Sequence, residues 1–113
     1  MIFTDSLKSN FDFKAVYRSG RSKANKYLIM YIKENDLSGK NRIGISVSKK
    51  VGNSVVRHKV KRLIKESYRL NEDMFNSGLD IVVIARSNAK VACFCEMQSA
   101  LLHVSKLLHI LKV

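Results

Sequence analysis

Hydrophobic and polar residues follow two different periods along this chain, and both periods indicate regular secondary structure. Near the beginning, Phe13, Val16 and Tyr17 recur at helical spacing and are followed by Gly20. Glycine often follows the last turn of a helix because it accepts backbone conformations that other residues resist. We therefore expect a short first helix over residues 10–19.

Strict alternation of apolar and other residues then predicts two strands. Over residues 27–33, alternate positions form two faces, with Tyr27, Ile29 and Tyr31 on one and Leu28, Met30 and Ile32 on the other. Over residues 42–48, aliphatic side chains face one way and small residues such as Gly44 and Ser46 face the other. A bulky group can therefore lie across that second face. The intervening residues 36–41 predict a turn.

Three further elements complete the pattern. Asn53 is a suitable cap for a helix that continues to about Arg69, with Val56, Val60, Leu63, Ile64 and Ser67 on its apolar side. Residues 79–86 form a nearly continuous aliphatic run, which predicts an interior strand covered on both faces. Residues 93–112 carry apolar side chains at helical spacing and predict a helix that packs on the core.

Length and composition fit one domain over residues 1–113. Of the 113 residues, 46% are hydrophobic and 27% are charged, which excludes a wholly disordered chain. No apolar run approaches the roughly 18–20 residues that span a bilayer. Asp5 precedes any hydrophobic stretch, so we also expect no signal peptide.

The charge of the chain is strongly positive and concentrated in one segment. There are 21 Lys and Arg residues against 9 Asp and Glu residues, a net charge of +12. Between Lys40 and Arg69 there are ten basic residues and one acid, so this segment alone carries +9. A focused positive field predicts a polyanionic partner, either a nucleic acid or an anionic membrane surface.

The helix after Asn53 carries most of this focused charge. Arg57, Lys61 and Lys65 lie at intervals of four residues and share a face, as phosphates along a polynucleotide require. The alternative is a solvated helix face, but such faces usually interleave lysine with glutamate, and here Glu66 is the only acid. Nucleic-acid binding is therefore the favoured interpretation.

Three aromatic residues form a weaker signal. Phe13 and Tyr17 are one helical turn apart, and Tyr31 lies on a predicted strand. Bases of single-stranded nucleic acids stack on exposed rings with little sequence preference. The alternative is that these rings belong to the core, which spacing alone favours, because most of the nine aromatic residues of a domain of this size are buried.

No set of catalytic residues emerges from the sequence. His103 and His109 are six residues apart and do not share a helix face, and Cys93 and Cys95 lack the further ligands of a zinc site. The acidic residues are too scattered for a nuclease that uses two metal ions. We expect no protein-bound metal, no catalytic residue in this chain and a reducing, cytoplasmic location.

The segment RIGISVSKKVGNSVVRHKVKRLIKE, residues 42–66, resembles the signature of the bacterial ribonuclease P protein subunit. It joins a strand ending in Ser-Lys-Lys, a Val-Gly-Asn turn and a basic helix in a fixed order. The segment DFKAVYRSGRS, residues 12–22, is similar to the first helix and following turn of the same family. The resemblance covers essentially the whole chain.

This resemblance implies a fold and a function. The fold is an α/β (α+β) two-layer sandwich with the order helix–strands–basic helix–strand–helix, a mixed sheet of about four strands and a left-handed crossover. Physical rules alone favour a right-handed one. The implied function is that of a subunit of an endoribonuclease that removes the 5′ leader of precursor tRNA. The RNA subunit carries out the cleavage with Mg²⁺, while the protein raises the affinity for substrate and metal and requires no protein partner.

The resemblance also implies roles for individual residues. It implies RNA-subunit binding by six residues: Lys50, Arg57, His58, Lys61, Arg62 and Lys65. It implies binding of the precursor-tRNA leader by seven: Phe13, Tyr17, Ile29, Tyr31, Ser46, Lys50 and Arg57. The chain departs from the family pattern at His58, where asparagine is usual, and at Lys59 and Lys65, where arginine is usual. Lysine keeps the charge of arginine but loses its planar fork.

Two alternatives to this function differ in class. A purely structural RNA-binding protein, such as a ribosomal protein, needs the same basic helix but no cleft for a leader. A nuclease acting alone needs clustered acids, which the sequence lacks.

Overall fold

The computed structural model describes residues 1–37 and 39–112, and its helices and strands follow the predicted order with additions. The predicted turn at 36–41 includes residue 38, which lies outside the described residues. In chain order the elements are β1 (Thr4–Ser6), α1 (Asn10–Ser19), β2 (Arg21–Ala24), β3 (Leu28–Glu34), β4 (Asn41–Ser46), α2 (Ser54–Leu70), the 3-10 helix η1 (Glu72–Met74), β5 (Leu79–Ala85), the 3-10 helix η2 (Ser87–Val91) and α3 (Phe94–Leu107).

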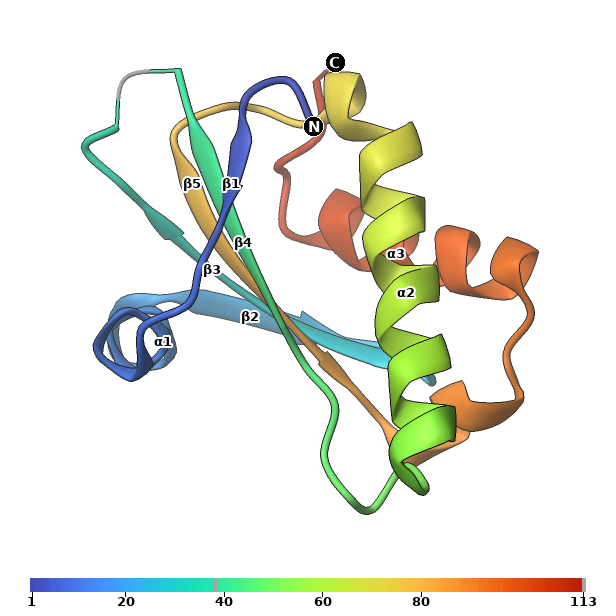
Figure 1. Cartoon of the computed structure of the whole chain (residues 1–113). Coiled ribbons are helices and arrows are strands. Elements are labelled where there is room, and N and C mark those ends of the chain that lie inside the picture. The colour runs from blue at the N-terminus through green and yellow to red at the C-terminus, as the bar shows by residue number, and fades with distance from the viewer. Residues whose placement is uncertain (38, 113) are drawn as a thin grey trace.

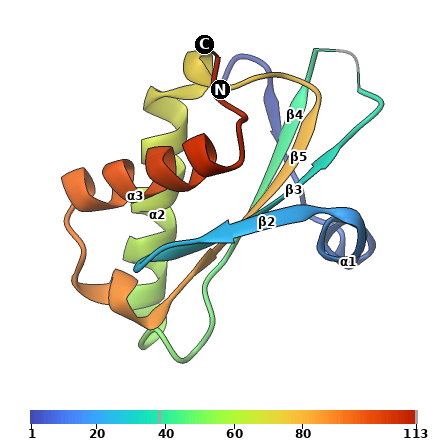
Figure 2. The same cartoon turned by 180° about the vertical axis from the view of Figure 1, so that it is seen from behind.

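The strands form one mixed sheet in the order β1-β4-β5-β3-β2. β4 is parallel to β1 and β5, whereas β3 is antiparallel to β5 and β2. Helices α2 and α3 cover one face of the sheet, and α1 lies against the other face (Figures 1 and 2). The predicted α+β class is therefore confirmed, with five strands where about four were expected. The hand of the crossover through α2 stays a prediction.

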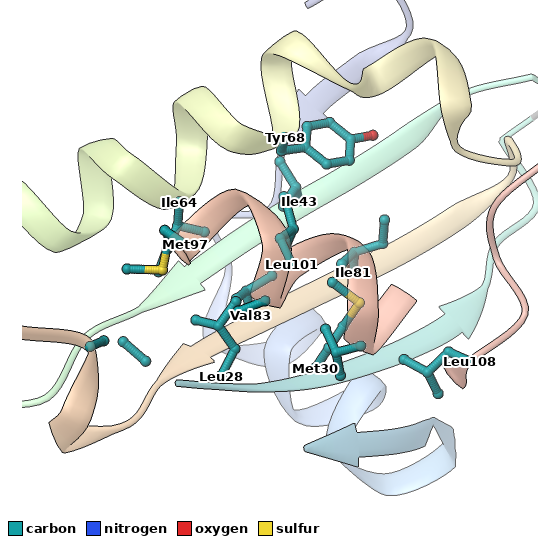
Figure 3. Packing of buried hydrophobic residues seen from close by; sticks show 14 of the residues in the cluster. Leu28, Met30, Ile43, Ile64, Tyr68, Ile81, Val83, Met97, Leu101 and Leu108 are labelled. Carbon is teal, nitrogen blue, oxygen red and sulfur yellow. The ribbon is translucent and has the colours of Figure 1, made fainter. Parts of the chain in front are cut away.

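The main core lies between the sheet and the pair α2 and α3. Figure 3 shows side chains from both helices meeting those of β3, β4 and β5. The central strand β5 is buried on both faces, because Ile81 and Val83 point into this core while Val82 packs against Val16 of α1. The aliphatic run that predicted an interior strand is thus explained by cover from both sides.

Two predictions about element boundaries and faces are wrong. The last helix ends at Leu107 instead of continuing to residue 112, because His109 adopts a left-handed conformation (φ 58°) and Leu111 pairs with Phe75. Tyr27 does not share a face with Tyr31, because it precedes β3 and its hydroxyl donates to Glu96 of α3 at 3.0 Å.

Two buried carboxylates hold peripheral segments to the core. Glu72 accepts hydrogen bonds from the backbone N–H groups of Ile2 (2.7 Å) and Phe3 (3.2 Å) and from the Thr4 hydroxyl. Burial alone would raise the pKa of Glu72, but these hydrogen bonds and the terminal amine outweigh it and hold the pKa below its ordinary value. This carboxylate therefore fastens the beginning of the chain beside α2.

Asp80 on β5 is the second buried carboxylate. It pairs with Arg42 of β4 at 2.6 Å and accepts a hydrogen bond from Asn35 at 2.9 Å. Burial raises its pKa, but the hydrogen bonds and charge of Arg42, aided by Asn35, reverse that effect and lower the pKa of Asp80. Arg42 also pairs with Asp12 of α1 at 3.4 Å, which links the helix to the sheet.

Acid is expected to destabilise this fold. A carboxylate with a lowered folded-state pKa contributes stability that is complete above the ordinary carboxyl range, about pH 4, and that is lost as the pH falls through the folded pKa. We expect the Tm to drop as the pH is lowered below that range and the Asp80→Asn variant to show a shallower drop. Calorimetry as a function of pH measures this, with Asp5→Asn, an exposed site, as the control. Identical pH slopes in wild type and Asp80→Asn would contradict the role of Asp80.

Candidate RNA interface

Helix α2 presents the predicted basic stripe to solvent. Its N-terminus is capped by Asn53, whose side chain accepts from the Val56 N–H at 3.0 Å, as the sequence predicted. Val60 and Ile64 are buried against the sheet. The opposite side carries basic residues that are exposed, namely His58, Lys59, Lys61, Arg62, Lys65 and Arg69. The predicted division of this helix into an apolar and a basic side is confirmed, except that Arg57, predicted on the exposed basic side, is half-buried.

Acidic neighbours do little to neutralise this stripe. Glu66 is the only acid on α2, and it forms an ion pair with Arg69 at 2.8 Å, at the end of the helix. The hydrogen bond from Arg69, and then the charges of Arg69, Arg62 and Lys65, lower the pKa of Glu66. The side chains of Lys61 and Lys65, earlier on the helix, remain available for phosphates.

The three aromatic residues singled out from the sequence do meet on the opposite face of the sheet. The ring centroids of Phe13 and Tyr17 are 6.4 Å apart, and those of Tyr17 and Tyr31 are 5.0 Å apart in an edge-to-face arrangement. Tyr17 keeps 38% of its surface exposed, so its ring can meet a ligand. Burial, and then the neighbouring Tyr31, raise the pKa of Tyr17, so its hydroxyl stays protonated at neutral pH.

The small-residue face of β4 is where Phe13 of α1 rests. A Cβ atom added to Gly44 would overlap the ring of Phe13, so only glycine allows the ring to lie so close to the strand. The bulky group that the sequence predicted over this face is therefore, at Gly44, the protein's own Phe13. One step further along β4, Ser46 remains beside the helix and lines an open groove with Phe13 and Tyr17.

Strand register brings two more predicted residues together. Ser46 of β4 lies opposite Ile84 of β5, and Ile84 lies opposite Ile29 of β3. These three side chains therefore share one row on the face that α1 partly covers. Ile84 was missed in the sequence, because nothing in an aliphatic run shows which of its members will lie between two other strands.

The groove is basic at its borders, and none of the described residues that line it is acidic. Its lining includes Lys8, Asn10 and Lys14 in addition to Phe13 and Ser46. Neither lysine was predicted, although their positions just before and within the first helix could have suggested them. Both lysines line the same groove as the rings of Phe13 and Tyr17, so a ligand of the groove can contact them as well.

A second groove continues from the first at the open edge of β4. It shares Lys8, Phe13 and Ile45 with the first groove and is bordered by Lys61 and Lys65 of α2. The strand β1 pairs with β4 only as far as Ile43, which leaves this edge uncovered. The basic stripe and the aromatic groove are thus neighbouring parts of one surface.

Two predicted leader-binding residues lie elsewhere. Lys50 is exposed in the turn before α2, and Arg57 lies in the first turns of α2. Neither is among the described residues that line the two grooves. The Nε atom of Arg57 is buried and has no hydrogen-bond partner among the described residues. The structure therefore groups these two residues with the start of the basic helix.

Other chemistry-bearing residues have structural contacts. Cys93 caps α3 in a reciprocal arrangement with Glu96, and His103 lies 3.3 Å from the Asn25 side chain. Within residues 1–37 and 39–112, no three His, Cys, Asp or Glu residues are grouped in a way that could hold a metal ion. No helix in the described part of the chain is both long enough and apolar enough to cross a membrane.

Comparisons with known proteins decide the family. The model of the family described as Ribonuclease P matches residues 3–110. The chain belongs to the ribonuclease P protein family. It is 59% identical to the ribonuclease P protein component of Lachnoclostridium phytofermentans, covering 92% of this chain and 89% of that protein. It is 60% identical to the same component of Alkaliphilus metalliredigens, covering 88% of this chain.

Solved structures of ribonuclease P proteins share the fold. The Staphylococcus aureus protein superimposes with a TM-score of 0.87 at 38% identity, covering 95% of this chain and 97% of that one. The Thermotoga maritima protein gives a TM-score of 0.82 at 29% identity, covering 90% of this chain and 96% of that one.

Membership in this family settles the class of function. The chain is the protein subunit of ribonuclease P, an endoribonuclease that processes tRNA, and its partner is the RNA subunit of that ribonucleoprotein. The alternative of a purely structural RNA-binding protein is not supported.

Proposed function

We propose that α2 binds the RNA subunit of ribonuclease P and that the aromatic groove binds the unpaired 5′ leader of precursor tRNA. The observation that carries the second part is the partly exposed Tyr17, whose ring meets Tyr31 in a groove bordered by lysines. A leader is single-stranded, and bases without a pairing partner stack on such rings. Mature tRNA has no leader and cannot make this contact.

The electrostatics of the surface support one continuous RNA track. Lys61 and Lys65 border the second groove at the edge of β4, and Lys8 and Lys14 border the adjoining aromatic groove. Each lysine beside a phosphate releases a condensed counterion, so binding becomes stronger and dependent on salt. This chain therefore supplies binding and positioning energy for the substrate.

The cleavage itself is assigned to the RNA subunit with Mg²⁺. Magnesium prefers oxygen ligands in octahedral geometry and usually binds proteins through one or two carboxylates. The acids beside the basic surface are engaged elsewhere, Asp12 with Arg42 and Glu66 with Arg69. We therefore place the ion on RNA phosphates, where the basic surface would lower the repulsion between the two RNAs, and we place the complex in the cytoplasm.

Binding to the RNA subunit is expected to strengthen mildly as the pH falls from about 8 to 6 because of His58. This exposed side chain lies on the basic stripe, and a phosphate of bound RNA beside it would favour the imidazolium form. Affinity measured against pH checks this, with His58→Asn as the variant and His103→Asn, on α3, as the control. Superimposable pH profiles of the wild type and His58→Asn would show that His58 does not contact RNA.

Crosslinking tests whether the leader and the RNA subunit bind to the two different surfaces. A precursor tRNA carrying photoreactive uridines in its leader is bound to the complex of this chain with a ribonuclease P RNA. We expect the leader to attach to peptides that contain Phe13 and Tyr17 or Ile29 and Tyr31. Photoreactive RNA subunit is expected to attach to α2. A leader that attaches only to α2 or α3 would contradict the proposal.

A further inference from the structure

The outer face of α1 carries an aromatic residue that the groove does not use. Phe11 is 78% exposed, more than any other aromatic side chain in the described part of the chain. Phe11 and Phe13 point to nearly opposite sides of the helix, because two residues correspond to roughly 200° of rotation. Phe13 rests on the sheet, so Phe11 faces solvent away from it.

Two basic side chains lie beside this exposed ring. Lys14 and Arg18 lie three and seven residues further along α1, so they follow Phe11 on the same side of the helix, and both are exposed. Asp12, the only acid in α1, is turned toward the sheet and pairs with Arg42 at 3.4 Å. The outer face of α1 is therefore an exposed ring beside two cations, with no acid on the same side of the helix.

This face is continuous with the leader groove. Lys14 lines the groove and is also one helical turn from Phe11. An RNA strand that leaves the groove over Lys14 would next meet Phe11. The other end of the groove opens toward Lys61 and Lys65 of α2, which we assign to the RNA subunit. A leader long enough to pass beyond Lys14 would therefore bring a further unpaired nucleotide to Phe11.

We propose that Phe11, with Lys14 and Arg18, binds an additional unpaired nucleotide of long leaders outside the groove. Charge complementarity favours RNA over a second copy of this chain, because contact between two such faces would bring Lys14 and Arg18 against like charges. This inference rests on the proposed leader groove and extends it. It predicts that any gain in affinity for a precursor tRNA with a long leader depends on the side chain of Phe11.

The test compares two precursor tRNAs bound to the reconstituted holoenzyme. One carries a long unpaired leader, and the other a leader trimmed to the nucleotides next to the cleavage site. We expect Phe11→Ala to weaken binding of the long-leader RNA about 5- to 10-fold, the lower part of the range for one base stacked on a ring. Binding of the short-leader RNA is expected to be unchanged, and Phe11→Tyr should retain the wild-type values.

One control variant and the following outcomes decide whether the inference holds. Val91→Ala removes an exposed apolar side chain on η2 and is expected to change neither affinity. Equal affinities of wild type and Phe11→Ala for the long leader overturn the inference, as does an equal loss on both RNAs. A lower degree of self-association of free Phe11→Ala in sedimentation would instead assign the face to a second copy and also overturn it. If Tyr17→Ala weakens precursor binding while Phe11→Ala does not, only this extension fails, whereas an inert Tyr17→Ala means that the groove proposal fails.

Discussion

Replacing Lys61 and Lys65 together with alanine is expected to weaken binding to the ribonuclease P RNA strongly and to flatten its dependence on salt. Both side chains are exposed on the basic stripe and border the groove at the edge of β4. Each lost phosphate contact should reduce the slope of log affinity against log salt by roughly 0.7–0.9. Affinities titrated over a series of potassium concentrations measure this slope.

The matched control is a second pair of exposed lysines away from this surface. Lys90 on η2 and Lys106 on α3 carry the same charge, so the double variant Lys90→Ala and Lys106→Ala loses the same net charge. We expect this control to keep a nearly wild-type slope, and both double variants to keep the wild-type Tm. Equal changes in slope for the two pairs would mean that only net charge matters and that α2 is not the binding element.

Removing the Tyr17 ring is expected to weaken binding of precursor tRNA to the holoenzyme by about 1–3 kcal/mol. The ring lies between Phe13 and Tyr31 and is partly exposed, so Tyr17→Ala removes the middle of the stacking surface. Binding of mature tRNA and assembly with the RNA subunit should change little, because neither uses the leader. Tyr17→Phe should keep most of the affinity, since stacking does not need the hydroxyl.

A core role for Tyr17 predicts a different pattern. If the ring mainly supports the packing of α1, Tyr17→Ala would lower the Tm clearly and weaken both tRNAs equally. Tyr27→Ala is the control for loss of a partly buried tyrosine, because Tyr27 packs beside α3 on the other side of the sheet. Affinities for the two tRNAs, measured alongside a thermal melt of each variant, distinguish the two roles.

The parts of the fold predicted best are those in which burial follows a simple period. The first helix and its glycine end, the Asn53 cap of α2 and the alternation in β3 and β4 can all be read from neighbouring residues. The two edge strands were missed. β2 is exposed at every position, and β1 is three residues long and polar, so neither shows an apolar pattern. Backbone pairing and distant contacts such as that of Glu72 with Phe3 hold such strands.

The features of the candidate site also divide into those that a single helix shows in its sequence and those that depend on how distant elements pack. The basic stripe of α2 is a property of one helix and was predicted from spacing alone. The aromatic groove needs α1 to lie across β3 and β5 with Phe13 over Gly44 of β4, whereas residue spacing alone favoured a core role for its rings. Ile84 and the border lysines depend on strand register and on the path of the chain before α1. No local pattern encodes these features.

Reconstituted cleavage tests the central claim most directly. A bacterial ribonuclease P RNA is incubated with precursor tRNA over a range of Mg²⁺ concentrations, with and without the purified chain. We predict that the chain lowers the Mg²⁺ concentration needed for cleavage at the mature 5′ end and has no activity without the RNA. An unchanged Mg²⁺ dependence, or cleavage by the chain alone, would contradict the account.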